Sequence, residues 1–215
     1  RFEASLHKHV WEISRKYSRA SSANNHLVGE AAGVFVACAY FNHWRGAKRW
    51  RDDAFAILAR EIDLQSYADG GGREQAIGYQ LFVLQFFLCA GLVARATGRD
   101  FPEAFWSRIE RMCDFVFAMI EGGDHLPMFG DADDGQVIDL GGAPGDPRPL
   151  LAVAAVLFSR PEYARVGRGG AEAVYWMCGA TGPGRLEALA DKDVARRLSS
   201  RAFADSGQYL LQAGE

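Results

Sequence analysis

The sequence has 215 residues, of which 49% are hydrophobic, and its formal net charge at pH 7 is −3. A chain of this length and composition buries a substantial core, so one large domain, or one domain with part of another, is expected. The slightly negative charge argues against a general nucleic-acid binder and against a protein that coats an anionic membrane. The chain begins at Arg1 inside a predicted helix, so we interpret it as a piece of a longer polypeptide whose N-terminus gives no information on localisation.

Most of the chain is predicted to be helical, because apolar residues recur three and four positions apart through most of its length. Three consecutive glycines at 70–72 interrupt this pattern, and residues 122–149 are predicted to be loop because they are rich in Gly, Asp and Pro. In chain order, the predicted helices span residues 2–18, 27–41, 47–64, 74–96, 102–121, 150–158, 170–178 and 184–190.

Two helical segments, 27–41 and 81–94, are apolar nearly all round, whereas the other long helices have one apolar face. A helix that is apolar on every face is expected to be buried on every face. Inner helices that alternate with amphipathic outer ones predict an all-α fold, an incomplete α/α toroid of helical hairpins over residues 1–198; a plain helical bundle is the alternative. Segment 81–94 is interrupted by Gln85 and is too short to span a bilayer, so no transmembrane helix is predicted.

The sequence changes character near its end. Ser206 and Gly207 are followed by residues 208–212, QYLLQ, which are more typical of a strand than of a helix. Residues 199–215 are therefore expected to begin a second, truncated domain with its first strand.

The four cysteines, Cys38, Cys89, Cys113 and Cys178, lie far apart and form no CxxC pair. Three of them lie in apolar helical segments, where a thiol behaves as a small hydrophobic group. We therefore predict unpaired, buried thiols.

The stretch SSANNHLVGEAAG carries more polar side chains than the start of a helix needs. Asn24 or Asn25 is expected to cap the following helix, which contributes about 1 kcal/mol. His26 and Glu30 are four residues apart and therefore share a helix face. Gly29 between them costs about 1 kcal/mol relative to alanine, which favours the close approach of another group. A metal site is not favoured, because no second His or Cys ligand lies nearby.

A second polar stretch, GGREQAIGYQ, precedes the other apolar helix. Arg73 in a first helical turn would oppose the helix dipole, and Gln75 and Tyr79 would share one face. Gly78 leaves the backbone bare beside the tyrosine. The alternative is that the Tyr79 ring packs in the core and its hydroxyl finds an incidental partner.

Two further stretches have a structural and a functional interpretation. Residues 130–135, GDADDG, resemble the start of a calcium loop, but Gly142 stands where a bidentate glutamate is required, so a turn built from Asp side chains is favoured. Residues 43–51, HWRGAKRWR, place basic residues beside two tryptophans; they would bind an anionic, ring-shaped ligand or form a solvated charged face.

Four segments, in order along the chain, resemble the helical domain of heparinase II/III-like polysaccharide lyases, a group that includes heparin lyases and oligoalginate lyases. They are NNHLVGEAAG (24–33), DG followed by REQAIGYQLFVL (69–84), GDADDG (130–135) and SRAFADSGQYLL (200–211). The resemblance implies that residues 199–215 begin the C-terminal β-sandwich that helps to close the active cleft. It also implies a bacterial protein that is periplasmic or secreted.

Members of this family cleave uronate-containing polysaccharides by β-elimination, and the resemblance implies no cofactor and no metal. The proton at C5 of the sugar becomes acidic only when donors share the charge of the adjacent carboxylate; the resemblance assigns this role to Asn25 and His26. It assigns proton transfer to Tyr79. A free phenol ionises near pH 10, so Tyr79 needs nearby positive charge or donors, for which Arg73 and His26 are the candidates.

Supporting roles are expected for the neighbouring polar residues. Glu30 would orient His26 or a neighbouring backbone group, and Glu74 and Gln75 would contact sugar hydroxyls. Asn24 and Arg73 complete the expected substrate-binding or supporting residues. The catalytic histidine that relatives contribute from the β domain lies outside this chain.

The predicted function is thus a polysaccharide lyase fragment whose partner is an acidic polysaccharide or oligosaccharide, with no nucleic acid and no membrane span. One alternative is a non-catalytic polysaccharide-binding module of an envelope or exopolysaccharide system. Another is a glycoside hydrolase, which needs two opposed carboxylates; Glu30 and Glu74 are the available pair.

Overall fold

The computed structural model describes residues 1–123, 125–131, 135–139, 141–193 and 199–212. Within these residues the chain forms nine α-helices, one short 3-10 helix and a two-stranded sheet, so the prediction of a mostly helical fold is confirmed. The chain divides into two compact units, Arg1–Gln65 with Phe86–Arg108, and Ser66–Gln85 with Ile109–Glu215. We call them unit 1 and unit 2 and describe each by itself.

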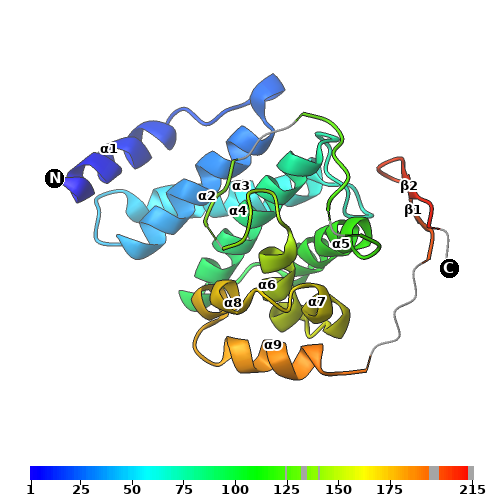
Figure 1. Ribbon diagram of the computed structural model, residues 1–215. Helices are drawn as coiled ribbons and strands as arrows, with labels where there is room; N and C mark the ends of the chain where they lie inside the picture. Colours follow the sequence, from blue (N-terminus) through cyan, green and yellow to red (C-terminus); the bar gives the residue numbers. More distant parts are fainter. Residues whose placement is uncertain (124, 132–134, 140, 194–198, 213–215) are drawn as a thin grey trace. The chain divides into compact units, whose positions relative to one another are not determined.

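Unit 1 is built around a pair of long helices and a group of aromatic rings. Helices α2 and α3 pack against each other, as Figure 1 shows, and α1 contacts α2. The rings of Phe55, Phe101 and Phe105 stack in sequence with centroids 4.1 Å apart, and Phe35 lies 6.0 Å from both Phe55 and Phe101. This unit contains α1 (Phe2–Ile13), α2 (Asn25–Tyr40), α3 (Ala47–Gln65) and the C-terminal part of α4 (Ile77–Ala96).

Unit 2 combines a cluster of short helices with a β-hairpin. Figure 1 shows the short helices as a yellow and orange group in which α6 packs against α7, α8 and α9. Strands β1 (Arg201–Phe203) and β2 (Gln208–Leu210) pair antiparallel, so the predicted strand near 208 is present. The helices are the N-terminal part of α4, most of α5 (Glu103–Ile120), α6 (Arg148–Phe158), α7 (Pro161–Val166), α8 (Ala171–Cys178) and α9 (Gly182–Ala190).

Two helix boundaries differ from the sequence-based expectation by three residues or more, and one helix was not expected. Helix α1 ends at Ile13, five residues early, and the hydroxyl of Ser14 donates to the carbonyl of Trp11 at 2.9 Å, because serine competes for backbone groups near helix ends. Helix α4 begins at Ile77, three residues late, because Gln75 has a φ of +52°, which is incompatible with a right-handed helix. Helix α7 was not predicted at all; it is only six residues long and starts with Pro161.

The expectation that both apolar helices are buried on every face is wrong for α2, whereas no residue of segment 81–94 in α4 is exposed. In α2, His26, Gly33 and Tyr40 are exposed and lie seven residues apart, so they form one stripe along the helix. Helix α4 extends beyond the apolar segment 81–94: its 20 residues would be enough to cross a membrane by length and composition alone, but 56% of its most apolar window is buried within the protein. That burial is what the core helix of a folded domain shows.

Gly29 is explained by packing within unit 1. A Cβ at this position would lie 2.8 Å from Cζ and 3.0 Å from Cε2 of the half-buried Phe86 ring, so the close approach predicted from the sequence is made by another side chain of the same unit. A Cβ at Gly33, one turn further along α2, would have no atom of another part of the chain within 4 Å.

The two glycines of α2 therefore make a matched pair for mutagenesis. Gly33→Ala is expected to raise the free energy of unfolding by about 0.5–1 kcal/mol, because alanine favours a helix at a site with free space. Gly29→Ala is expected to lower it by about 1 kcal/mol or more, because overpacking against the Phe86 ring outweighs the same helical gain. Urea unfolding of both variants measures the difference; a Gly29→Ala variant as stable as Gly33→Ala would contradict the packing argument.

All four cysteines are unpaired, as predicted, and Cys38 and Cys113 are fully buried, whereas Cys89 and Cys178 are half-buried. Burial disfavours the charged thiolate. Burial raises the pKa of Cys38 and of Cys89 to about 11, and it also raises the pKa of Cys113 and of Cys178. The thiols are thus poor nucleophiles at neutral pH.

Raised thiol pKa values in the folded state predict a loss of stability in alkaline solution. The stabilising contribution of the buried, neutral thiol of Cys89 is complete below pH 9, where the thiol is neutral in both the folded and the unfolded state. It is lost as pH rises from 9 to 11, because the thiol then ionises more readily in the unfolded state. Because a tenfold change in an ionisation constant corresponds to about 1.4 kcal/mol, ionisation of Cys89 alone costs about 2–3 kcal/mol. Chemical denaturation should show the gap between wild type and Cys89→Ala constant below pH 9 and narrowing above it; a constant gap up to pH 11 would contradict the prediction.

Candidate functional site

The start of α2 separates the roles of the two adjacent asparagines. Asn24 is the cap: its Oδ1 accepts a hydrogen bond from the backbone N–H of His26 at 3.1 Å. Asn25 is the first residue of the helix and is buried, with 8% of its surface exposed, whereas the His26 side chain is exposed. Capping is thus accounted for by Asn24, and Asn25 is a buried polar residue that the cap does not require.

The segment that leads into α2 is held at two points by side chains of unit 1. Glu30 accepts hydrogen bonds from both the backbone N–H and the hydroxyl of Ser18, at 2.6 and 2.7 Å. Of the two roles expected for Glu30, the orientation of a neighbouring backbone group is therefore the one that its contacts support. Both carboxylate oxygens are occupied, which argues against Glu30 as one of two opposed carboxylates of a hydrolase.

The second holding point was not anticipated from the sequence. The side-chain amide of Gln65 donates to the carbonyl of Ala23 at 2.7 Å, directly before Asn24, and to Glu61 at 2.8 Å. Glu61 is 2% exposed and also accepts from the guanidinium of Arg60 at 2.7 Å. The available signal was a pair of polar residues four apart on the apolar side of an amphipathic helix.

The residues around the start of α4 are arranged differently from the expectation. Arg73 and Gln75 precede the helix, so Arg73 does not oppose the helix dipole and Gln75 does not share a helix face with Tyr79. The guanidinium of Arg73 lies over the Tyr67 ring, 4.5 Å from its centroid. The Gln75 amide donates to the carbonyl of Ser206 at 3.1 Å and accepts from Gln208 at 2.9 Å. Tyr79 itself lies in the first turn of α4 and is half-buried.

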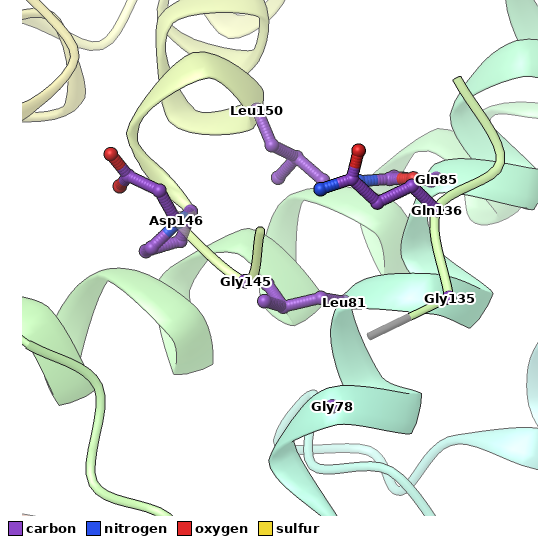
Figure 2. Close-up of a pocket in the computed structure, with 9 residues that line it drawn as sticks. Gly78, Leu81, Gln85, Gly135, Gln136, Gly145, Asp146 and Leu150 are labelled. Atoms are coloured by element: carbon purple, nitrogen blue, oxygen red, sulfur yellow. The ribbon is translucent and has the colours of Figure 1, made fainter. Parts of the chain in front are cut away.

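A pocket lies beside this turn, within unit 2. Gly78, Leu81 and Gln85 form one wall along a single face of α4, and residues 135–136, 145–147 and 150 form the other. Figure 2 draws Asp146 and Gln136 at opposite sides of the view. The cavity itself has a volume of only about 30 Å³, which is enough for a water molecule and lies far below the roughly 300–1,000 Å³ of small-molecule sites. Gln85 also accepts a hydrogen bond from the N–H of Val137 at 3.0 Å, which ties the long loop to the helix.

The two remaining stretches add little to this site. Residues 132–134 of GDADDG lie outside the described part of the chain, so the predicted Asp-rich turn stays a prediction. In the basic stretch 43–51, Trp44 and Trp50 are buried and pack on the ring of His7 with centroids 5.0 and 5.5 Å away. The tryptophans thus serve the core, and the solvated-face interpretation is favoured for the charges around them.

The expected site residues fall into two groups. Asn24, Asn25, His26 and Glu30 lie in unit 1, and Arg73, Glu74, Gln75 and Tyr79 lie in unit 2. Within each unit they gather at the start of an apolar helix. Their convergence on one substrate stays a prediction.

Residues 1–140 match the family described as heparinase II/III N-terminus. The chain belongs to the heparinase II/III family. It is 34% identical over 134 residues to a heparin-sulfate lyase of Bacteroides stercoris, and the match covers 61% of this chain and 20% of that protein. The chain spans about a fifth of the length of the curated relatives that it matches.

Solved structures show the same helical fold. A heparinase III with methylated lysines is 28% identical, with a TM-score of 0.58, over 76% of this chain and 24% of that one. A mutant of a heparan sulfate lyase from Pedobacter heparinus matches 99% of this chain and 29% of its own, with a TM-score of 0.60 and 22% identity. The mostly helical fold of this heparinase II/III member is thus that of the heparinase III helical domain.

Proposed function

We propose that the full-length protein containing this chain is a polysaccharide lyase that cleaves uronate-containing acidic glycans by β-elimination. The observation that carries the proposal is the family match over residues 1–140, which contains the polar starts of α2 and α4. The helical fold would be part of an α/α toroid over residues 1–198, and residues 199–215 would begin a β-sandwich. A bacterial periplasmic or secreted location follows from the same proposal.

The proposed chemistry uses side chains at the starts of the two apolar helices. The amide of Asn25 and the imidazole of His26 share the charge of the uronate carboxylate, so the C5 proton becomes acidic enough to remove. Tyr79 transfers that proton. As the C5–H bond breaks, a C4=C5 double bond forms and the C4–O bond breaks, and the departing sugar oxygen takes up a proton.

The neighbouring polar groups would bind or support the substrate. Asn24 and Glu30 hold the chain on either side of Asn25 and His26 through the cap and through Ser18. Arg73 and Glu74 would lie close to the sugar near Tyr79.

A glycan of the heparan sulfate type is the first substrate to test, because the curated relatives carry the name heparin-sulfate lyase. Alginate and bacterial exopolysaccharides complete the panel. No cofactor is required by this mechanism.

The test is to incubate the full-length protein with this panel and to follow the ultraviolet absorbance of the unsaturated uronate end. Absorbance that rises with time on one substrate supports the lyase. Tight glycan binding without absorbance would replace it by a non-catalytic binding module. New reducing ends without absorbance would indicate hydrolysis instead.

A further inference from the structure

The β1–β2 hairpin is packed onto the elements that surround the start of α4. Phe203 of β1 is 8% exposed and belongs to a cluster with Ile77, the first residue of α4, and Phe115 of α5. The rings of Phe115 and Phe203 are 4.8 Å apart. Apolar burial thus holds the hairpin against the first turn of α4 within unit 2.

Two polar side chains join the hairpin to the loop before α4. Asp69 accepts hydrogen bonds from the backbone N–H and the hydroxyl of Ser206 at 2.8 and 3.1 Å, and its other oxygen accepts from the N–H of Gly71 at 3.1 Å. Gln75 donates to the carbonyl of Ser206 and accepts from the Gln208 amide. The hairpin is therefore hydrogen-bonded to both ends of the loop 69–75, at Asp69 and at Gln75.

The loop between these two points leaves little room for rearrangement. Gln80, which is 3% exposed, donates its side-chain amide to the carbonyl of Gly70 at 2.9 Å. A Cβ at Gly71 would lie 2.5 Å from Ser206, and one at Gly72 would lie 2.6 Å from Oε1 of Gln80. Gln75 ends the loop with a positive φ, which a residue adopts only when its surroundings hold it there.

We propose that the β1–β2 hairpin, through Asp69 and Gln75, positions the first turn of α4 and with it the Tyr79 side chain. This rests on the proposed function for its catalytic consequence. Gln75 is then a positioning residue and not a sugar ligand, because both ends of its amide are engaged by the hairpin. The start of the C-terminal domain would thus control the geometry of proton transfer in the helical domain.

The experiment compares Gln75→Ala, Gln208→Ala and the double variant in the full-length protein, with Tyr209→Thr as the control. Tyr209 is 67% exposed and lies next to Gln208 on β2. Both single variants should lower kcat about 10-fold or more with KM within about twofold, because small misplacements of a reacting group cost rate and not binding. The double variant should be no slower than either single one, and Tyr209→Thr should leave kcat unchanged.

Hydrogen exchange of the amides of residues 76–80 tests the positioning without any substrate. Exchange should be about 3- to 10-fold faster in both single variants, as expected for the loss of one hydrogen bond. If Gln75→Ala raises KM and Gln208→Ala leaves both kcat and KM unchanged, Gln75 contacts the sugar. If the exchange rates of residues 76–80 are unchanged in the variants, the hairpin does not hold the first turn of α4. Either result overturns the inference. If the variants exchange faster than the wild type but the wild type itself has no lyase activity, the proposed function is wrong and the positioning of α4 by the hairpin still holds.

Discussion

Replacing Tyr79 by phenylalanine is expected to lower kcat for glycan cleavage by at least about 100-fold, because a positioned general acid or base contributes about 10²–10⁴ in rate. The ring and its packing in the first turn of α4 are retained, so stability should change little. Tyr40→Phe is the matched control, since Tyr40 lies on α2 with 79% of its surface exposed. Ultraviolet absorbance of the unsaturated product measures both variants; cleavage by Tyr79→Phe at the wild-type rate would remove Tyr79 from the mechanism.

Asn25→Ala is the companion variant, and the adjacent asparagine provides its comparison. Loss of one donor that faces developing negative charge costs about 10²–10³ in kcat, so Asn25→Ala should be nearly inactive. Asn24→Ala removes the helix cap and should lower the free energy of unfolding by about 1 kcal/mol, with a much smaller loss of activity. Equal losses of activity in the two variants would mean that the start of α2 matters only for folding.

The largest expected effect on stability is that of Gly70→Ala. Gly70 has a φ of +93°, and a Cβ there would lie 2.1 Å from the carbonyl oxygen and 2.4 Å from the carbonyl carbon of Arg111, which are backbone atoms of α5. The left-handed conformation alone costs about 1–2 kcal/mol, and the collision adds an overpacking cost of about 1–3 kcal/mol. A loss of about 3 kcal/mol or more is therefore expected.

Gly98→Ala separates the two contributions. Gly98 also has a positive φ, of +74°, but no atom lies within 4 Å of its Cβ position. It should lose only the conformational part, about 1–2 kcal/mol. Urea unfolding of both variants gives the comparison, and equal losses would show that the loop moves away from α5 without cost.

The existence of most helices was predictable because the apolar spacing of 3.6 residues is a local property of the sequence. The boundaries were less predictable. Helix α4 was placed three residues too early, since nothing local to Gln75 shows that its backbone adopts a positive φ or that its side-chain amide bonds Ser206 and Gln208. Those partners lie more than 130 positions away along the chain.

The candidate site shows the same division. The polar stretches that begin at Asn24 and Arg73 stand out in the sequence because they interrupt apolar helices. The roles of individual residues cannot be read from the sequence in the same way. Gly29 was expected to allow the close approach of another group, and in the structure the Phe86 ring is that group. Gln75 looked like a sugar contact, and its amide is bonded to the hairpin.

By itself, the sequence determined the helical class, the unpaired thiols, the strand near the C-terminus and the family of this protein, because periodicity, composition and short motifs are carried by neighbouring residues. Only the tertiary structure decided that Asn24 is the cap, that Glu30 holds Ser18 and that Asp69 and Gln75 hold the hairpin. For Glu30, Asp69 and Gln75 the hydrogen-bond partner is distant in sequence. For Asn24 the sequence offers two adjacent asparagines, either of which could cap the helix. Which polar group a side chain satisfies depends on what the folded chain brings within hydrogen-bonding distance.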